Sequence, residues 1–491
     1  MNRVAIFAVA LFAIQMLEGT ALYFSVGCVA FILVAALAFN TAGGLTRASG
    51  AYVFAYSVLV VIIGLCYKAF LGEPADSNLL DPRTDIEAYV ASATGLLAAV
   101  IVSRRFSRKS GLLQSMLKES EMYRASVGCI AFGIAGVFII ALLGESGARL
   151  ESAFGQLNQL IPLGIIIGVM YEIRRSGGAR STNLPIIIGA AYYFFLGVVG
   201  FSKQGMLAPL FCWLLPVCAL RFRLSAWQML SFLLAIFVMF HYLVPFSQYG
   251  RGFVPEGATQ SDRIAIAIPF LEHPEETRRL YYEQENVFLG QQLSSYYSTP
   301  GGFWERLQMI SPDDRLIEVT DQGKVFGLLP IKLELMNAVP HVFWPDKPGT
   351  NFGNMYAHDI SGESQGEGDT ETGISFSPTA EAYHLARWVG VLVVAPLIWC
   401  IFFTAYDTIL GDLRASPWGL LGLATITFIA PEAGVTGVIH LLTFGVEILV
   451  FCAFFATWVA PLFAIALLGP DRRKSQSRIS FRPTLTPRIP R

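Results

Sequence analysis

Two basic residues occupy positions suited to holding an anion beside a membrane. Arg251 lies between Gly250 and Gly252, just after a long apolar stretch ends. The planar guanidinium group of arginine binds phosphate through paired hydrogen bonds, and neighbouring glycines let the backbone approach a ligand closely. Lys203 lies between two apolar stretches, where an ammonium group is costly unless it has a partner. We expect both residues to bind an anionic group, the alternative being that both side chains extend to lipid headgroups.

A turn stiffened by proline carries further ionisable side chains. The segment from Pro340 to Pro348 reads PHVFWPDKP and contains His341, Asp346 and Lys347. Proline fixes the backbone φ angle, so such a turn holds its side chains in place at low entropic cost. His341 is therefore a candidate acid or base, and Lys347 is a candidate ligand for a substrate.

A carboxylate stands immediately before an apolar stretch that begins near residue 387. Glu381 is followed by Tyr383 and His384, and this segment is expected to lead straight into a membrane helix. A carboxylate at that depth can accept the proton of a hydroxyl group. We expect Glu381 to act as a general base, with His341 or His384 as alternatives and Tyr383 and His384 as substrate contacts. The structural alternative is that Glu381 complements the positive end of a helix dipole.

The composition is that of an integral membrane protein. Of the 491 residues, 54% are hydrophobic and 14% are charged, and the mean hydropathy is +0.54, whereas soluble domains carry about 25% charged residues. We expect an all-α polytopic fold with about twelve transmembrane helices, although several apolar stretches are shorter than the ~20 residues that a bilayer core requires. The stretches fall near residues 4–17, 20–39, 51–71, 88–102, 125–144, 157–172, 183–201, 206–220, 226–246, 387–406, 416–433 and 437–468.

One long polar segment divides the chain. We expect an N-terminal transmembrane bundle of about nine helices at residues 1–246, and C-terminal transmembrane helices at 387–470 followed by a basic tail at 471–491. Residues 247–386 form one large loop with short amphipathic helices between the ninth and tenth spans. The loop holds 20 Asp and Glu against 9 Lys and Arg, so no nucleic-acid partner is indicated.

Basic residues predict the orientation. Short linkers rich in Lys and Arg stay on the cytoplasmic side of a membrane. Here they follow the fourth, sixth and eighth apolar stretches, at residues 104–124, 174–180 and 221–223. The basic tail shares this side if there are twelve spans. Both termini are therefore expected in the cytoplasm, and the acidic loop outside, in the periplasm of a Gram-negative cell.

Three features of the loop resemble the Wzy-type oligosaccharide repeat-unit polymerases. They are the turn at residues 340–348, the Gly-rich stretch that ends with Gly373-Ile374-Ser375, and Glu381-Ala382-Tyr383 followed by a helix that starts Trp388-Val389-Gly390. Members of that family are bacterial inner-membrane glycosyltransferases of O-antigen, lipopolysaccharide, capsule and exopolysaccharide biosynthesis. The resemblance implies a helical fold like that of the lipid-donor, GT-C class of transferases.

The resemblance also implies a reaction at the periplasmic face. The donor would be a growing glycan on undecaprenyl diphosphate and the acceptor one lipid-linked repeat unit, with membrane lipids and a chain-length regulator as further partners. No nucleotide sugar is available there, so lipid diphosphate must be the leaving group. Lys203 and Arg251 would stabilise its developing charge, and Glu381 would activate the acceptor hydroxyl. We therefore expect Lys203 and Glu381 to face one cavity.

No metal or other cofactor is expected. Metal-dependent lipid-donor transferases usually carry an Asp-x-Asp or Glu-x-Asp pair in an early external loop, and the loop at residues 72–85 has none. The carboxylates of the Gly-rich stretch are irregularly spaced and are interpreted as solvated side chains; they are Glu363, Glu367, Asp369 and Glu371.

Three ionisable residues of the apolar stretches need separate interpretation. His241 and His440 are interpreted as residues of the helix bundle whose hydrogen bonds are satisfied there. Glu432 follows Pro431 at the outer membrane level and is a candidate to line the cavity.

Two other functions remain as alternatives. A ligase for lipid-linked glycans would share the fold and the basic residues and differ in its acceptor. A polysaccharide transporter or flippase fits less well, because it needs no external catalytic block and is expected to carry charged residues through its spans, which here are almost free of charge.

Overall fold

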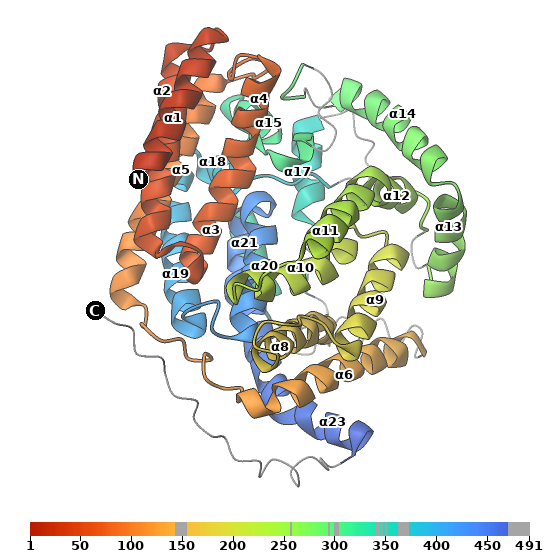
Figure 1. Ribbon diagram of the computed structural model, residues 1–491. Coiled ribbons are helices and arrows are strands. Elements are labelled where there is room, and N and C mark those ends of the chain that lie inside the picture. Colours follow the sequence, from red (N-terminus) through yellow and green to blue (C-terminus); the bar gives the residue numbers. More distant parts are fainter. Residues whose placement is uncertain are drawn as a thin grey trace.

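The structure is a computed structural model that describes residues 1–142, 155–255, 258–292, 295–298, 304–339, 344, 347–348, 351–361 and 373–469. Within these residues the secondary structure is helical and includes no strand, apart from one isolated parallel bridge between Phe376 and Ala433. The prediction of an all-α fold is confirmed (Figure 1).

The N-terminal part consists of helices joined by short turns. Two of its long helices contain a π-helical turn, η2 and η5, which joins two α-helical halves. The elements are α1 (Asn2–Leu17), α2 (Leu22–Ala42), η1 (Gly44–Thr46), α3 (Ala48–Tyr56), η2 (Ser57–Ile62), α4 (Ile63–Leu71), α5 (Pro82–Phe106), η3 (Glu119–Glu121), α6 (Met122–Leu142), η4 (Gly155–Gln159), α8 (Leu160–Arg175), α9 (Leu184–Val199), α10 (Lys203–Ala219), α11 (Ala226–Val238), η5 (Met239–Leu243) and α12 (Val244–Arg251).

The polar loop contains helices of 4 to 19 residues, and the C-terminal part returns to apolar helices. The loop contains α13 (Gln260–Glu272), α14 (Pro274–Gln292), η6 (Trp304–Leu307), α15 (Ile310–Asp321), α16 (Leu329–Asn337) and α17 (Phe352–Ser361). The C-terminal part contains α18 (Pro378–Val389), η8 (Gly390–Val394), α19 (Ala395–Leu410), α20 (Pro417–Glu432), α21 (Gly434–His440), η9 (Leu441–Gly445), α22 (Val446–Phe454), η10 (Phe455–Val459) and α23 (Ala460–Leu468).

Seven helices of the described chain are long and apolar enough to cross a membrane, as expected of a polytopic membrane protein. They are Leu22–Ala42, Ala48–Leu71, Pro82–Phe106, Glu119–Ile139, Ala226–Arg251, Pro378–Leu410 and Gly434–Leu468. Each of the other five predicted stretches overlaps a helix of only 16 or 17 residues. At 1.5 Å per residue these reach about 26 Å at most, less than the ~30 Å of a hydrocarbon core.

The early loop and the polar loop pack together at one end of the bundle. Lys68, at the end of α4, is completely buried and donates hydrogen bonds to the carbonyl oxygens of Ser77 and Tyr296. Its Nζ also lies 3.8 Å from the centre of the Tyr296 ring. The Tyr296 hydroxyl in turn donates to the carbonyl of Ala75 over 2.6 Å. A buried lysine is tolerated here because carbonyl oxygens and an aromatic face replace its water.

The basic linker after α5 lies at the opposite end of that helix. The first turn of α5 adjoins α15, because the amide of Leu80 donates to Asp314 over 2.8 Å. The helix then runs for 25 residues, or about 37 Å, before the linker begins. There the amides of Leu112 and Leu113 donate to the carbonyls of Thr408 and Ile409 at the end of α19. Figure 1 likewise places α15 and α17 at one end of the molecule and α6 and α23 at the other.

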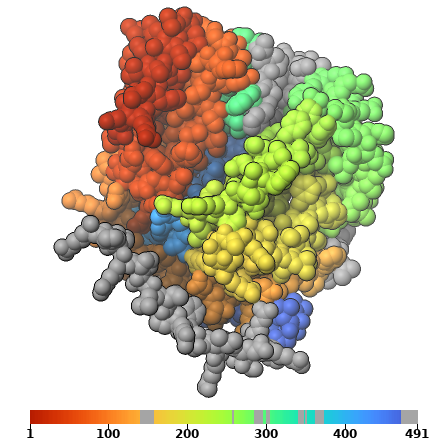
Figure 2. Space-filling view, in the orientation of Figure 1, coloured from red at the N-terminus to blue at the C-terminus, as the bar shows by residue number. Residues whose placement is uncertain are grey.

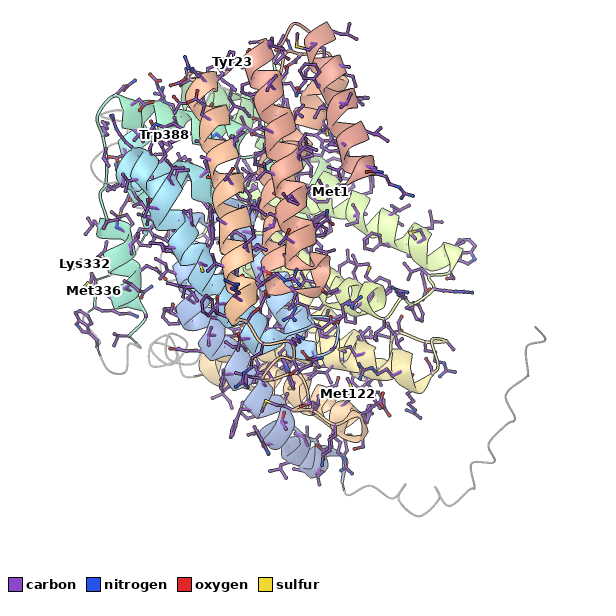
Figure 3. The ribbon with its side chains drawn as sticks, turned by 90° about the vertical axis from the view of Figure 1, so that its left-hand side faces the viewer. Met1, Tyr23, Met122, Lys332, Met336 and Trp388 are labelled. Carbon is purple, nitrogen blue, oxygen red and sulfur yellow. The ribbon has the colours of Figure 1, made fainter. Side chains whose placement is uncertain are left out.

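The polar loop also covers one flank of the bundle. Figure 3 shows α16, with Lys332 and Met336, on the outer side of the molecule, and this helix packs against α21. The loop therefore brings side chains of α16 next to the C-terminal helices.

This arrangement predicts that the loop and the linker face opposite sides of a membrane. In a variant without native cysteines, a cysteine in place of the exposed Glu276 of α14 should react with a membrane-impermeant thiol reagent in intact spheroplasts. A cysteine in place of Ser110, exposed in the basic linker, should react only after the membrane is opened. Equal labelling of the two positions in intact spheroplasts would contradict the predicted orientation.

Candidate functional site

Two cavities open beside the C-terminal helices, and one of them, here called the polar cavity, has three carboxylate side chains among its lining residues. It has a volume of about 240 Å³. Its walls come from α16, α17, α18 and the segment before it, α21, and the turn of residues 432–436 that joins α20 to α21. The lining residues are Glu334, Phe352, Gly353, Tyr356, Ile374, Ser375, Phe376, Glu381, Glu432, Ala433, Gly434, Thr436, Gly437 and His440.

Glu381 reaches the polar cavity from a short helical segment that is buried on all sides. Ser377 caps the segment by accepting a hydrogen bond from the amide of Thr379, and Pro378 occupies the first helical position, where proline is favoured. The eight residues from 378 to 385 are all buried. The helical backbone then breaks, because Ala386 has φ −158° and Arg387 has φ 50° and ψ −136°.

The break corrects the expectation that Glu381 leads straight into a membrane helix. Arg387 donates a hydrogen bond over 3.0 Å to the carbonyl of Thr320, which ties the break to the end of α15. After the break, Gly390 passes so close to the buried segment that an added Cβ would lie 1.7 Å from the carbonyl oxygen of Ala382. Glu381 therefore lies beside the start of the long helix and not on its extension.

Both carboxylate oxygens of Glu381 accept hydrogen bonds. The Tyr356 hydroxyl donates to Oε1 over 2.8 Å, the Thr436 hydroxyl donates to Oε1 over 2.7 Å, and the Thr436 amide donates to Oε2 over 2.9 Å. The side chain is 1% exposed. A buried carboxylate needs such donors because it has lost its water, so the three bonds fix both its position and its orientation.

The turn that supplies Thr436 is shaped by a glycine. Gly434 has φ +65°, and its amide donates to the carbonyl of Phe376 over 3.2 Å. A Cβ added at Gly434 would lie 2.2 Å from Oε2 of Glu381. Glycine is thus required both for the left-handed backbone and for the close approach of the carboxylate.

A histidine and a second carboxylate meet in another part of the polar cavity. His440 Nδ1 lies 3.0 Å from Oε1 of Glu334. Glu334 is buried, whereas the side chain of His440 is 46% exposed. His440 thus has a hydrogen-bond partner, as expected for a residue of the helix bundle. Its ring also lines the polar cavity, which that interpretation did not include.

Lys347 supports the helix that carries Glu334. Its ammonium group donates to the carbonyls of Asn337 and Val339 over 2.7 and 2.9 Å. These carbonyls belong to the C-terminal end of α16, where cations are favoured. Burial lowers the pKa of Lys347. The structure thus gives Lys347 a helix-capping role, and the residue lines neither cavity.

The second cavity is mainly apolar and has a volume of about 270 Å³. Figure 2 shows a recess between the N-terminal helices and the α11–α12 segment, and this apolar cavity is lined from the same parts of the chain. Its polar residues come in pairs from three helices: Lys203 and Gln204 from α10, Tyr281 and Tyr282 from α14, and Thr427 and Glu432 from α20. The lining residues are Leu59, Lys203, Gln204, Leu207, Phe211, Phe240, Val244, Pro245, Tyr281, Tyr282, Leu307, Met309, Thr427, Phe428, Pro431 and Glu432.

Arg251 lies next to the turn that carries Lys203. Its guanidinium group donates to the carbonyl of Phe201 over 3.2 Å, two residues before Lys203. Phe201 itself has φ 47°. Gly250 packs against this turn, because a Cβ there would lie 2.2 Å from the Phe201 ring. The two predicted anion ligands are therefore neighbours, and the glycine beside Arg251 makes room for an aromatic ring.

The expectation that Lys203 and Glu381 face one cavity is wrong. Lys203 lines the apolar cavity and Glu381 lines the polar one. The two cavities adjoin at Glu432, which lines both, as its place in the sequence suggested. The Gln204 amide donates to Oε1 of Glu432 over 3.1 Å, so the first turn of α10 is held directly against the end of α20.

Tyr383 and His384 point away from both cavities. The Tyr383 hydroxyl donates to Asp321 over 2.8 Å. The buried His384 ring bonds Thr320 Oγ1 over 2.8 Å through Nδ1 and Asp359 Oδ2 over 3.1 Å through Nε2. Both side chains connect the buried segment to α15 and α17, which is a positioning role and not the predicted contact with substrate.

Acidic residues of the early and polar loops anchor the start of the same segment. Asp313 is fully buried and accepts hydrogen bonds from the Ser377 amide over 2.9 Å and the Tyr89 hydroxyl over 2.7 Å. Burial raises the pKa of Asp313 to about 7. Asp85 lies in the same buried region. Among the described residues, no group of three or more His, Cys, Asp and Glu side chains is arranged to hold a metal ion.

Several predicted residues lie outside the described part of the chain. They are His341, Asp346, Glu363, Glu367, Asp369 and Glu371. Conversely, the residues that sequence reasoning missed are those that hold Glu381 and complete the polar cavity: Glu334, Tyr356, Gly434 and Thr436. The only local signal was the Gly-Val-Thr-Gly run at residues 434–437, which directly follows Glu432 and Ala433.

Comparisons of this chain with protein-family models, curated proteins and solved structures find no match. The chemistry of the site is therefore interpreted from its own residues.

The contact between Gly434 and Glu381 predicts a measurable loss of stability. Gly434→Ala should lower the unfolding temperature in detergent, because it combines a left-handed backbone, costing about 1–2 kcal/mol for a residue with a Cβ, with displacement of the buried carboxylate.

Gly177→Ala is the matched control. Gly177 has φ +60°, but an added Cβ there would meet nothing within 4 Å. The Gly177→Ala variant should therefore lose only the free energy of the strained backbone, and it should unfold at a higher temperature than Gly434→Ala. Equal melting temperatures for the two variants would show that the contact with Glu381 contributes nothing to stability.

Proposed function

We propose that this protein is an integral-membrane glycosyltransferase that joins oligosaccharide repeat units carried on undecaprenyl diphosphate. One observation carries the proposal: an apolar cavity with a basic residue adjoins a polar cavity with carboxylates, and Glu432 lines both. A reaction that moves a glycan from a lipid diphosphate to a hydroxyl group needs these two environments side by side. The resemblance to Wzy-type polymerases points to the same reaction.

The apolar cavity suits the lipid part of the donor. Its aromatic and aliphatic walls would hold the isoprene units nearest the diphosphate, while the rest of the chain stays in the bilayer. Lys203 lines this cavity, and Arg251 lies at the adjoining turn. Negative charge develops on the diphosphate as the bond to the sugar breaks, so basic groups here stabilise the leaving group.

The polar cavity suits the acceptor sugar. Sugars bind through many hydroxyl groups, each of which both donates and accepts, and carboxylates are strong acceptors for them. The reacting hydroxyl must also lose its proton as the new glycosidic bond forms, which requires a base within hydrogen-bond reach. Glu381 and Glu432 are the two carboxylates of this cavity that adjoin the 432–436 turn.

The proposed setting is the inner membrane of a Gram-negative bacterium. The polar loop would lie at the periplasmic face and the basic linkers and both termini in the cytoplasm, with about twelve helices and a GT-C-like arrangement. Donor and acceptor would both reach the cavities from the outer leaflet, and a chain-length regulator is a further candidate partner. Supporting this orientation, the polar loop and the 104–124 linker lie at opposite ends of α5.

Surface glycan from a deletion strain tests the proposal. Loss of the protein should leave glycan that carries a single repeat unit, because units are still made and transferred but no longer joined. Absence of all transferred glycan would identify a ligase instead. Normal long-chain glycan in the deletion strain would rule out both enzymes.

Complementation of the same strain tests the basic residues. Arg251→Ala should fail to restore long chains although the protein inserts normally, and Arg251→Lys should restore little, because an ammonium group lacks the paired donors of guanidinium. Arg279→Ala is the matched control, since Arg279 lies in the same loop and its ion pairs with Glu276 and Glu283 are exposed. Long-chain glycan made by the Arg251→Ala variant would show that Arg251 does not bind the diphosphate.

A further inference from the structure

We propose that Glu432 is the general base of the transfer reaction and that Glu381 is a positioning residue. The inference rests on the proposed function, because it assigns a role within that reaction. It follows from three properties of the two carboxylates: where each lies relative to the cavities, how its oxygen atoms are already bonded, and what holds it in place.

Location favours Glu432. The bond that forms joins the anomeric carbon of the donor sugar to the acceptor oxygen, so the base must stand where the two substrates meet. Among the lining residues of the two cavities, Glu432 is the one they share. Glu381 lines only the polar cavity, and the second acid of that cavity, Glu334, is engaged with His440.

Hydrogen bonding also favours Glu432. The carboxylate of Glu381 accepts bonds from Tyr356 and from two donors of Thr436, and it is 1% exposed. These donors already occupy acceptor positions on both oxygens of Glu381, which leaves fewer of them for a substrate hydroxyl. By contrast, the described residues give Glu432 one hydrogen bond, from Gln204 to Oε1, and Glu432 is partly exposed. Its Oε2 is thus the better placed oxygen for a substrate hydroxyl.

The same contacts explain why Glu381 is needed. Through Thr436 it holds one end of the 432–436 turn, while the bond from the Gly434 amide to Phe376 holds the middle. Gln204 holds the side chain of Glu432 at the other end. Because Gln204 directly follows Lys203, one turn of α10 aligns the base with the cation that faces the leaving group.

The proposed reaction transfers the glycan in a single step. The acceptor oxygen bonds to the anomeric carbon as its proton passes to Oε2 of Glu432. The bond between the anomeric carbon and the diphosphate oxygen breaks, and its electron pair leaves with the lipid diphosphate, whose added charge faces Lys203. Glu432 then releases the proton to water.

Purified protein in nanodiscs, supplied with lipid-linked repeat units from the deletion strain, tests this assignment. Glu432→Gln should lower kcat by about 100-fold or more, the range lost with a general base, with KM within about twofold of the native value. It should also remove the acidic limb of the pH–rate profile. Native turnover or an unchanged profile in Glu432→Gln would overturn the assignment.

Chemical rescue separates a base from a positioning residue. Glu432→Ala should regain part of its turnover when formate is added, because a small carboxylate can enter the vacated position at the junction of the cavities. Glu381→Ala should not respond to formate, since its defect lies in the displaced turn. Rescue of Glu381→Ala without rescue of Glu432→Ala would show that Glu381, and not Glu432, is the general base. If the native protein itself makes no polymer in this assay, the proposed function fails, which is a different result from either of these.

Discussion

The site depends on one buried carboxylate and its three donors. Glu381 lies in the interior, where a charge is tolerated only if hydrogen bonds replace its water. Its donors come from Tyr356 in the loop and from Thr436 in the C-terminal helices. The interaction therefore joins the polar loop, the buried segment of α18 and the 432–436 turn. The shape of the polar cavity and the position of Glu432 both follow from it.

In the proposed reaction, the separate polar and apolar cavities would match the two parts of the lipid-linked substrates. A lipid diphosphate carries its charge at headgroup depth with its chain in the bilayer, so an apolar wall and a cation must adjoin. Lys203 at the start of α10 meets that requirement, because the helix itself is apolar and only its first turn is polar. A sugar acceptor needs the opposite environment. Gln204, which lines the apolar cavity, connects the two cavities because it donates a hydrogen bond to Glu432, which lines both.

The sequence predicted the helices well and the site in part. All twelve apolar stretches overlap helices, because a segment packed in lipid or in a bundle has to be continuously apolar and bonded internally. Lys203, Arg251, Glu381 and Glu432 were recognisable as ionisable groups at the ends of such stretches. The grouping of Lys203 with Glu381 failed because it rested on a common reaction at headgroup depth, which does not fix the lateral position of either side chain. The break at Ala386 and Arg387 contains neither glycine nor proline, and the contact with Thr436 spans 55 residues.

The central claim is that the apolar cavity holds lipid and the polar cavity holds sugar, and photo-crosslinking tests it most directly. Phe211 lines the first cavity and Phe352 the second, and each can be replaced by p-benzoylphenylalanine. After irradiation with lipid-linked repeat units, mild acid cleaves the bond between sugar and diphosphate. Mass spectrometry should then find polyprenyl lipid on the position 211 peptide and sugar on the position 352 peptide. Lipid at position 352 with none at position 211 would contradict the claim.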